Sequence, residues 1–300
     1  MIFFSIILPT YNRAQLLQKA IESVINQTFN DWELIIVDDG STDATEQLVA
    51  SYMEKDTRIK YIYQENAERS AARNKGISYA NGQYICFLDS DDSYLSTNLE
   101  MWSEFYKIQN FPRCFAYSDI IIVQNEVKTK IILEPIYNNV FDFLFTNPLI
   151  PSRVSVHRSL LESDLFEISI SIGEDVCLWL KLALQNELLY SPHESVEYFL
   201  HSENSVNPTN PIALKMIEGY SWFFRKNPEI KVKINSLVFK SYLSKIRTNS
   251  AKYYLLKGKK TKAILELLKA IYLSPLHEHT KFRVRLILLI LLVRNPQFYE

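Results

Sequence analysis

Residues 5–13 read SIILPTYNR, and this stretch begins a repeated strand–helix pattern that indicates the fold class. Its apolar start is typical of a strand that is covered on both faces of a sheet. Apolar positions at helical spacing then predict a helix over about residues 13–27, with Asn12 as its N-cap. Further elements follow in the same order: strands at 32–37, 59–63 and 84–88, a helix that ends near residue 52, and a helix over 70–79. Repeated units of this kind predict an α/β fold with a doubly wound, mainly parallel sheet, in which ligands bind beyond the carboxyl ends of the strands.

Acidic side chains follow two of the predicted strands, at the edge of the sheet where a ligand is expected. Asp38 and Asp39 come after the second strand, and Asp89, Asp91 and Asp92 come after the fourth. Carboxylates placed so close together repel one another unless a positive group lies between them. A divalent cation that keeps several waters and bridges substrate phosphates is a natural counter-charge, and the alternative is a solvated acidic turn. The position directly after a buried strand favours the metal site.

The glycines argue against two common nucleotide-binding loops. None of the six glycines lies in a Gly-x-Gly-x-x-Gly or phosphate-loop spacing, which disfavours a nicotinamide enzyme and a P-loop NTPase. A sheet that binds a nucleotide without such a loop must hold the diphosphate by other means. Arg69 and Arg73, at the start of the third predicted helix, offer bidentate donors near a helix dipole, although each arginine taken singly also suits a solvated surface.

An ordered set of motifs resembles glycosyltransferase family 2. The resemblance covers residues 3 to about 100 and rests on the stretches SIILPTYNR (5–13), AIESVINQTF (20–29), ELIIVDDGSTD (33–43), ARNKGI (72–77) and DSDD (89–92). Each stretch alone is moderately specific, whereas their order and spacing together are very specific. The resemblance implies the GT-A fold and a metal-dependent glycosyltransferase that uses a nucleotide-sugar donor.

The family pattern also implies roles for individual residues. Pro9, Tyr11 and Asp39 would frame the nucleotide base, commonly uracil, and Arg69 or Arg73 would approach the diphosphate. Asp89 and Asp91 match the Asp-x-Asp motif that holds ribose and metal, and His201 matches a late family motif that reaches the metal or the diphosphate. The implied metal ligands are thus Asp91 and His201, with Mg²⁺ or Mn²⁺ as the ion. The implied nucleotide-sugar site comprises Pro9, Thr10, Tyr11, Arg13, Asp38, Asp39, Arg69, Arg73, Asp89 and Ser90.

Two carboxylates, Glu174 and Asp175, stand at the start of a helix predicted in the second half of the chain. Acids in a first helical turn are stabilised by the helix dipole, and this is the structural alternative for both. The stretch GEDVCLWLKL (173–182) is similar to the family's Glu-Asp motif, whose Asp deprotonates the acceptor hydroxyl. The resemblance therefore implies that Asp175 is the general base, a task for which a carboxylate is suited. One base without a covalent nucleophile implies a single displacement with inversion at the anomeric carbon.

The rest of the chain predicts a second, helical region. From about residue 111 to 201 the pattern loosens into short strands and loops, and the prolines at 207–211 suggest a linker. Residues 251–275 resemble one tetratricopeptide-like helical pair with Gly258 in its turn, which is too little for a repeat array. We therefore expect a GT-A domain over residues 1–210 and a helical region over 211–300.

Composition limits the possible partners and the compartment. The formal net charge is -1, so attraction to nucleic acid or to an anionic surface would have to come from local clusters. The three cysteines lack metal or disulfide spacing, and the N-terminus lacks the basic region of a signal peptide, so we expect a cytoplasmic protein. The apolar run 286–293, flanked by basic residues, is too short to span a bilayer. It is interpreted either as a buried helix or as an interfacial anchor at the cytoplasmic face of the membrane.

The sequence thus predicts an inverting glycosyltransferase that moves a sugar from a nucleoside-diphosphate sugar, such as a UDP-sugar, to a glycan or lipid-linked acceptor in cell-surface polysaccharide biosynthesis. Two alternatives remain open at this point, a catalytically inactive nucleotide-sugar-binding scaffold and a sugar-nucleotide pyrophosphorylase. The pattern does not name the sugar, the acceptor, the linkage or the oligomeric state.

Overall fold

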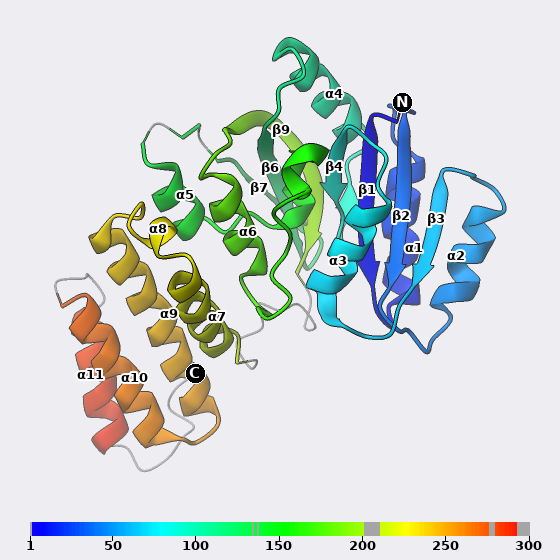
Figure 1. The fold of residues 1–300 in the computed structure, drawn as a ribbon. Helices are drawn as coiled ribbons and strands as arrows, with labels where there is room; N and C mark the ends of the chain where they lie inside the picture. Colours follow the sequence, from blue (N-terminus) through cyan, green and yellow to red (C-terminus); the bar gives the residue numbers. More distant parts are fainter. Residues whose placement is uncertain (1, 134, 137, 201–210, 276–279, 293–300) are drawn as a thin grey trace. The chain divides into compact units, whose positions relative to one another are not determined.

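The structure is a computed structural model that describes residues 2–133, 135, 136, 138–200, 211–275 and 280–292 (Figure 1). Its contacts divide the chain into two compact units. The sheet unit comprises Met1–Val140 and Pro148–His201, and the helical unit comprises Phe141–Asn147 and Ser202–Glu300. The predicted boundary near residue 210 lies outside the described residues and stays a prediction.

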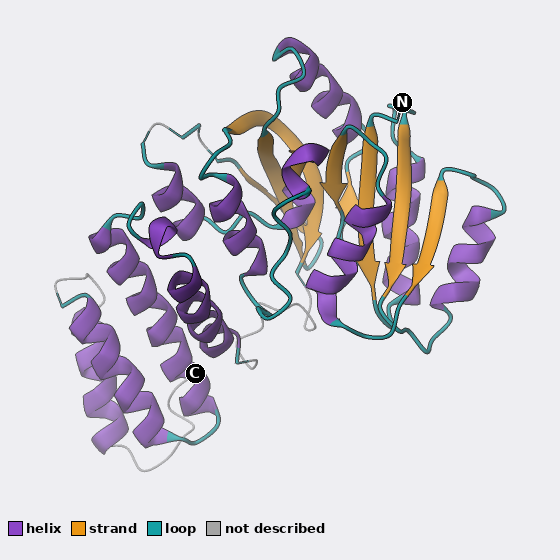
Figure 2. Ribbon diagram, in the orientation of Figure 1, coloured by secondary structure: helices purple, strands orange, loops and turns teal. Residues whose placement is uncertain are grey.

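The first half of the sheet unit follows the predicted strand–helix order. Four parallel strands lie in the order β3-β2-β1-β4: β1 (Phe4–Thr10), β2 (Trp32–Asp38), β3 (Ile59–Tyr63) and β4 (Tyr84–Phe87). Between them run three helices: α1 (Ala14–Ile25), α2 (Thr45–Met53) and α3 (Glu68–Tyr79). Figure 2 shows helices on both faces of these strands, and β1 and β2 are accordingly buried along their whole length. Gly76 lets α3 approach the sheet closely, because a Cβ atom there would lie 2.4 Å from Ile7 Cγ2.

The second half of the sheet unit adds mixed pairing to the parallel half. Strand β8 (Val154–His157) pairs antiparallel with β4 and with β6 (Phe115–Gln124), and β6 pairs in parallel with β9 (Leu188–Phe199). Strands β5 (Ser93–Tyr94) and β7 (Val127–Ile131) lie on β9 and β6. The remaining elements of this half are α4 (Asn98–Ile108), the short 3-10 helices Pro151–Arg153 and Arg158–Leu161, and α6 (Glu174–Leu182). Strands β6 and β9 are longer than the short strands expected here, with register shifts around Asp119 where the alternation breaks.

The predicted N-cap of α1 is wrong. Asn12 lies at φ 51°, and its side chain accepts a hydrogen bond from the backbone N–H of Thr42 at 2.7 Å. The start of α1 is stabilised instead by Asp43, whose Oδ2 accepts from the backbone N–H of Ala14 at 3.0 Å. Asn12 and Asp43 therefore join the two turns that follow β1 and β2.

The helical unit contains α7 (Ile212–Lys226), α8 (Pro228–Lys231), α9 (Ser236–Leu256), α10 (Lys260–Leu273) and α11 (Thr280–Leu292), together with most of α5 (Val140–Thr146). The predicted helical pair is present as the end of α9 and α10, which pack together around a turn where Gly258 has φ +69°. Phe145 of α5 packs among four aromatic rings of α7 and α9: Tyr220, Phe224, Phe239 and Tyr242. This packing explains why the segment near residue 145 belongs to the helical unit.

Helix α11, which carries the apolar run, fits neither sequence interpretation alone. Its Arg283 and Ile290 are buried, whereas Leu288 and Leu291 are more than half exposed. Among the described residues, no helix is long and apolar enough to cross a bilayer.

Candidate functional site

The carboxyl ends of β1, β2 and β4 meet at one edge of the sheet, because these strands run in parallel (Figure 1). Most of the site residues predicted from sequence lie there. Three buried polar atoms of this region, Thr10 Oγ1, Ser70 Oγ and Arg73 Nε, have no hydrogen-bond partner among the described residues. A buried polar group without a partner costs about 1–3 kcal/mol, so such groups are expected where a polar ligand completes the hydrogen bonding.

Arg73 lies at the centre of this edge and connects its two halves. The guanidinium is almost completely buried, and it donates from Nη2 to Asp89 Oδ1 at 2.7 Å and from Nη1 to Glu174 Oε1 at 3.0 Å. Burial would raise the pKa of Asp89, but the charge and hydrogen bond of Arg73 hold that pKa below its usual range. The arginine thus brings the start of α6 next to the end of β4, although Arg73 and Glu174 are 101 positions apart in sequence.

Three carboxylates, Asp89, Asp91 and Asp92, lie within four residues at the end of β4. Asp91 pairs with Arg13 at 2.7 Å, and Asp92 is buried and accepts a hydrogen bond from Ser152 Oγ at 2.9 Å. Burial, followed by the charges of Asp89 and Asp91, raises the pKa of Asp92 well above its ordinary value. Carboxylate oxygens suit a divalent cation that keeps water and substrate oxygens among its ligands, and the family pattern implies Asp91 as one protein ligand. No group of three or more metal-ligating side chains occurs in the described part of the chain.

Asp175 has the properties of a proton acceptor near neutral pH. It stands in the first turn of α6, directly after the Glu174 that Arg73 holds, and its Oδ1 accepts from the backbone N–H of Val176 at 2.7 Å. Burial, together with the negative charge of Glu174, raises the pKa of Asp175 to about 7. Arg73 and Arg69 act in the opposite direction, which places Asp175 within electrostatic range of both arginines.

The two acids that follow β2 are engaged within the protein. Asp38 accepts from the hydroxyl of Tyr61 at 2.7 Å and from the backbone N–H of Ser41 at 2.8 Å, so it holds the turn. Asp39 accepts two hydrogen bonds at one oxygen, Oδ1, from Gln64 Nε2 and from the backbone N–H of Ala67. Both carboxylates are buried. These hydrogen bonds show that both carboxylates stabilise the loops that follow β2.

The other predicted donor residues differ in exposure. Tyr11 is about half exposed and Arg69 is exposed, so both side chains are available to a ligand, whereas Pro9 and Ser90 are buried. His201 lies outside the described residues, and its predicted metal contact stays a prediction.

Three residues that are absent from the predicted list of catalytic, nucleotide-sugar and metal residues make specific contacts in this site: Glu174, Ser152 and Asp92. Glu174 was interpreted as a helix-start acid, yet it is the partner of Arg73. Ser152 accepts from the backbone N–H of Asp89 at 3.2 Å and donates to Asp92, so it fixes the acidic turn. A signal existed for Glu174 and Asp92, which adjoin motif residues, but Ser152 stands in a stretch without any motif.

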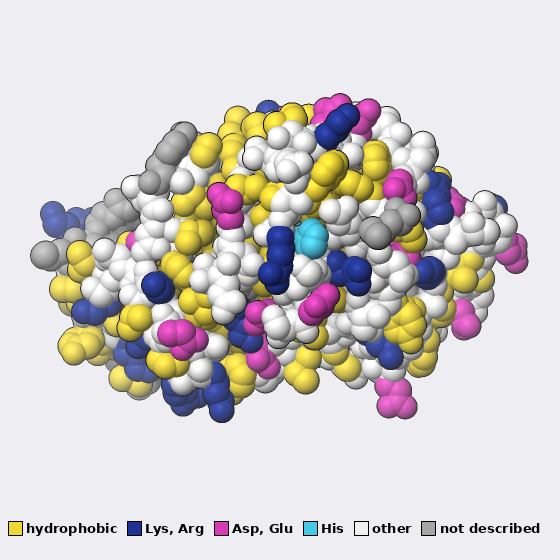
Figure 3. All heavy atoms as spheres, turned by 45° about the horizontal axis from the view of Figure 1, so that its top comes forward, with side chains coloured by type: hydrophobic (Ala, Val, Ile, Leu, Met, Phe, Trp, Pro, Cys, Tyr) yellow, Lys and Arg dark blue, Asp and Glu magenta, His cyan; other side chains and the backbone are white. Residues whose placement is uncertain are grey.

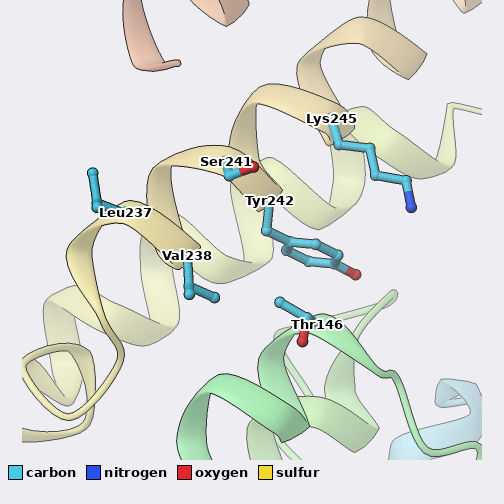
Figure 4. Close-up of a pocket in the computed structure, with 6 residues that line it drawn as sticks. All are labelled: Thr146, Leu237, Val238, Ser241, Tyr242 and Lys245. Carbon is cyan, nitrogen blue, oxygen red and sulfur yellow. The ribbon is translucent and has the colours of Figure 1, made fainter. Parts of the chain in front are cut away.

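A pocket of about 500 Å³ lies within the helical unit, and none of the residues described above lines it (Figure 4). Its lining is mainly apolar and contains no carboxylate: Thr146, Leu237, Val238, Ser241, Tyr242 and Lys245. Such a lining offers nothing to hold a metal–diphosphate group, so the strand-end edge of the sheet remains the candidate site.

Comparisons with known proteins agree with the motifs. The family described as Glycosyl transferase family 2 matches residues 5–134. An uncharacterized glycosyltransferase of Rickettsia felis is 36% identical over 190 residues, which are 61% of this chain and 31% of that protein. The chain therefore spans about a third of the length of this relative. An Escherichia coli protein named UDP-Glc:alpha-D-GlcNAc-diphosphoundecaprenol beta-1,3-glucosyltransferase WfgD is 34% identical over 188 residues, which are 61% of this chain and 71% of that protein.

Solved structures match the fold over most of the chain. TarS of Staphylococcus aureus in complex with UDP-GlcNAc superposes with a TM-score of 0.59 at 20% identity and covers 91% of this chain and 82% of that one. The mannosyltransferase PcManGT of Pyrobaculum calidifontis, in complex with GDP-Man and Mn²⁺, gives a TM-score of 0.56 at 16% identity and covers 97% and 88%. These similarities establish the GT-A fold that the sequence predicted. Together with the family match and the Escherichia coli relative, they show that the chain belongs to glycosyl transferase family 2.

Proposed function

We propose that the protein is an inverting glycosyltransferase that transfers a sugar from a UDP-sugar to an acceptor hydroxyl in the synthesis of a cell-surface glycan. One observation carries this proposal. Arg73 ties Asp89, at the strand end expected to hold the donor, to Glu174, whose neighbour Asp175 has a pKa of about 7. The two ion pairs of Arg73 therefore hold Asp89, in the expected donor site, close to the start of α6, where the proposed proton acceptor Asp175 stands.

The donor would bind along the carboxyl ends of β1, β2 and β4. Tyr11 and the loops shaped by Asp38 and Asp39 would surround the base, and Asp89 with Ser90 would contact the ribose. Arg13, Arg69 and Arg73 supply positive charge for the diphosphate, and the partnerless Arg73 Nε and Thr10 Oγ1 are donors that a phosphate could satisfy. Mg²⁺ or Mn²⁺, held by Asp91 and by His201 as the family pattern implies, would stabilise the negative charge of the departing nucleoside diphosphate.

Asp175 would accept the proton of the acceptor hydroxyl as this oxygen attacks the anomeric carbon. A pKa near the operating pH is the most effective for a general base, because a substantial fraction of the group is then ionised and the ionised form is still basic. We assign no second carboxylate as a covalent nucleophile, and a single displacement inverts the anomeric configuration.

The relatives support the kind of donor and acceptor. The Escherichia coli relative is named for transfer from UDP-Glc to a diphosphoundecaprenol-linked sugar, and the TarS complex contains UDP-GlcNAc. We therefore propose a lipid-linked glycan as the acceptor and the cytoplasmic face of the membrane as the place of reaction. The domain limits 1–210 and 211–300 belong to the same proposal.

The test is a transfer assay with the full chain, Mn²⁺, a panel of UDP-, dTDP- and GDP-sugars, and a GlcNAc-diphospho-lipid acceptor. We expect acceptor-dependent release of the nucleoside diphosphate with one donor, and a product of inverted anomeric configuration by NMR. Binding of a nucleotide-sugar without release would support the inactive scaffold. Formation of sugar 1-phosphate and nucleoside triphosphate on addition of pyrophosphate would support the pyrophosphorylase.

A further inference from the structure

The net charge of the whole chain is close to zero, but basic and acidic residues are distributed unequally along it. Of the 33 lysines and arginines, 18 lie in residues 211–300, whereas only five of the 34 aspartates and glutamates do. A charge asymmetry of this size between two parts of a chain indicates interaction of the basic part with an anionic partner. Figure 3 shows lysine and arginine side chains gathered with hydrophobic ones at its left end, where the helical unit lies.

The last two helices expose apolar residues in addition to charge. On α10, Leu265, Leu268 and Tyr272 recur at a spacing that places them on one side of the helix, and each is half exposed or more. The opposite side of α10, with Ala263 and Leu267, is buried against the neighbouring helices.

Helix α11 repeats this arrangement. Val284, Leu288 and Leu291 lie on one side and are 44%, 52% and 67% exposed, whereas Arg283 and Ile290 are buried. We call the two exposed sets, residues 265, 268 and 272 and residues 284, 288 and 291, the apolar stripes.

Basic residues are exposed on the two helices that carry the apolar stripes, and the ranges of these helices contain one carboxylate. Lys262, Lys281 and Arg285 are exposed on the same two helices. Glu266 is the single carboxylate within α10 and α11, and both of its oxygens are already paired, with Arg247 at 2.7 Å and Lys269 at 2.8 Å. The surface is therefore positive and apolar at once.

We propose that the α10–α11 surface docks on an anionic phospholipid membrane, with the apolar stripes at the boundary between headgroups and acyl chains and the basic residues among the headgroups. This combination is the one that interfacial helices use. A nucleic acid would pair with the basic residues but would leave six large apolar side chains in contact with water. The inference deepens the proposed function, since it supplies a surface that brings the enzyme to a lipid-linked acceptor.

The test is co-sedimentation of the full chain with vesicles of phosphatidylcholine alone or mixed in equal parts with phosphatidylglycerol. We expect binding to the mixed vesicles that weakens as salt is added. Lys262→Gln/Lys281→Gln/Arg285→Gln should lower the partition coefficient by about 100-fold, since each basic residue near an anionic surface contributes roughly fivefold. The matched control Lys55→Gln/Lys75→Gln/Lys107→Gln neutralises three exposed lysines of the sheet unit and should bind as the wild type does.

The apolar stripes are tested separately with Leu268→Ser/Leu291→Ser. This variant should bind more weakly, whereas Ile108→Ser/Val127→Ser, which changes exposed residues of the sheet unit, should not. Circular dichroism confirms that each variant is folded.

Several outcomes overturn the inference. They are equal binding to both vesicle types, equal loss in the matched control, salt-sensitive binding to duplex DNA without binding to vesicles, and burial of the apolar stripes in a lipid-free dimer detected by sedimentation equilibrium. No donor or acceptor is present in the assay. A chain that binds anionic vesicles but transfers no sugar would therefore overturn the proposed function and leave the docking surface intact.

Discussion

The sheet unit and the helical unit place their charged groups differently. The sheet unit buries Arg73, Asp92 and Glu174 at the carboxyl ends of its strands, each less than 5% exposed. In the described part of the helical unit, the buried acidic or basic side chains are Glu266 and Arg283, and the other lysines and arginines are at least partly exposed. Burying a charged group costs free energy unless the group is paired. Several buried charged groups at one edge of the sheet unit therefore indicate a site for charged ligands. The exposed basic groups of the helical unit indicate a surface that docks on a partner.

The largest effect is expected from Asp175→Asn. The amide cannot accept the proton of the acceptor hydroxyl, so kcat should fall by about 10²–10⁴-fold, the usual contribution of a general base. Because a carboxyl group whose pKa is raised by burial opposes folding when it is ionised, the melting temperature at pH 8 should be unchanged or higher. The measurements are a transfer assay and a thermal melt.

The control for this variant is Glu162→Gln, which neutralises an exposed acid of the same unit and should leave kcat unchanged. A fall of less than tenfold in Asp175→Asn would remove Asp175 from the catalytic role.

A second prediction concerns the pH profile. Because Asp175 must be ionised to act as a base, kcat/KM of the wild type should rise with pH through about 7. Burial and the charge of Glu174 both raise that pKa, so Glu174→Gln should lower it and move the acidic limb to lower pH. A profile that stays in place, or moves to higher pH, would show that Glu174 does not act on the base.

Substitutions of two glycines, Gly76 in the sheet unit and Gly258 in the helical unit, should lower stability for different reasons. Gly76→Ala should cost about 1–3 kcal/mol, because the new methyl group meets Ile7 Cγ2 in a packed core. At Gly258, φ is +69° but no atom lies within 4 Å, so alanine should cost only about 1–2 kcal/mol of backbone strain. Asparagine tolerates a positive φ, so at position 258 it should lower the free energy of unfolding less than alanine does. At position 76 its larger side chain should lower that free energy more than alanine does. Urea denaturation of the four variants measures these differences, and the same rank order at both positions would contradict the explanation.

The smallest effect is expected at Asp43, which caps α1 from a neighbouring turn. Asp43→Ala should cost about 1 kcal/mol, a typical value for a lost cap. Burial opposes ionisation, but hydrogen bonds from Thr45 and from the backbone N–H of Ala14 lower the pKa of Asp43 below its ordinary value. The stabilisation is therefore complete above the unfolded pKa and is lost as the pH falls through the lower folded pKa.

Asp43→Asn serves as the matched variant, because the amide can still cap but does not titrate. It should keep most of the stability and lose this part of the pH dependence. If the unfolding free energy of Asp43→Ala equals that of the wild type at neutral pH, the cap contributes nothing.

The sequence predicted the parallel half of the sheet because apolar runs such as 5–9 and 32–37 are local signals that a fully buried strand requires. It also predicted the position of α6 and the acids at its start. The contacts that complete the site are not local. The link from Arg73 to Glu174 spans 101 positions, and Asn12 fails as a cap because Thr42, 30 positions away, uses its side chain. For the same reason no local pattern assigned Phe145 to the aromatic core of the helical unit.

The central claim is that a nucleotide–metal site lies at the strand-end edge of the sheet unit. It is tested most directly by thermal-shift measurements of the full chain with UDP, dTDP and GDP and their sugars, with and without Mn²⁺, on the wild type and on Asp91→Ala. We expect a Mn²⁺-dependent rise in melting temperature with the uridine nucleotides that is lost in Asp91→Ala. A wild type that no nucleotide stabilises under either condition, or a shift that Asp91→Ala retains in full, would contradict it.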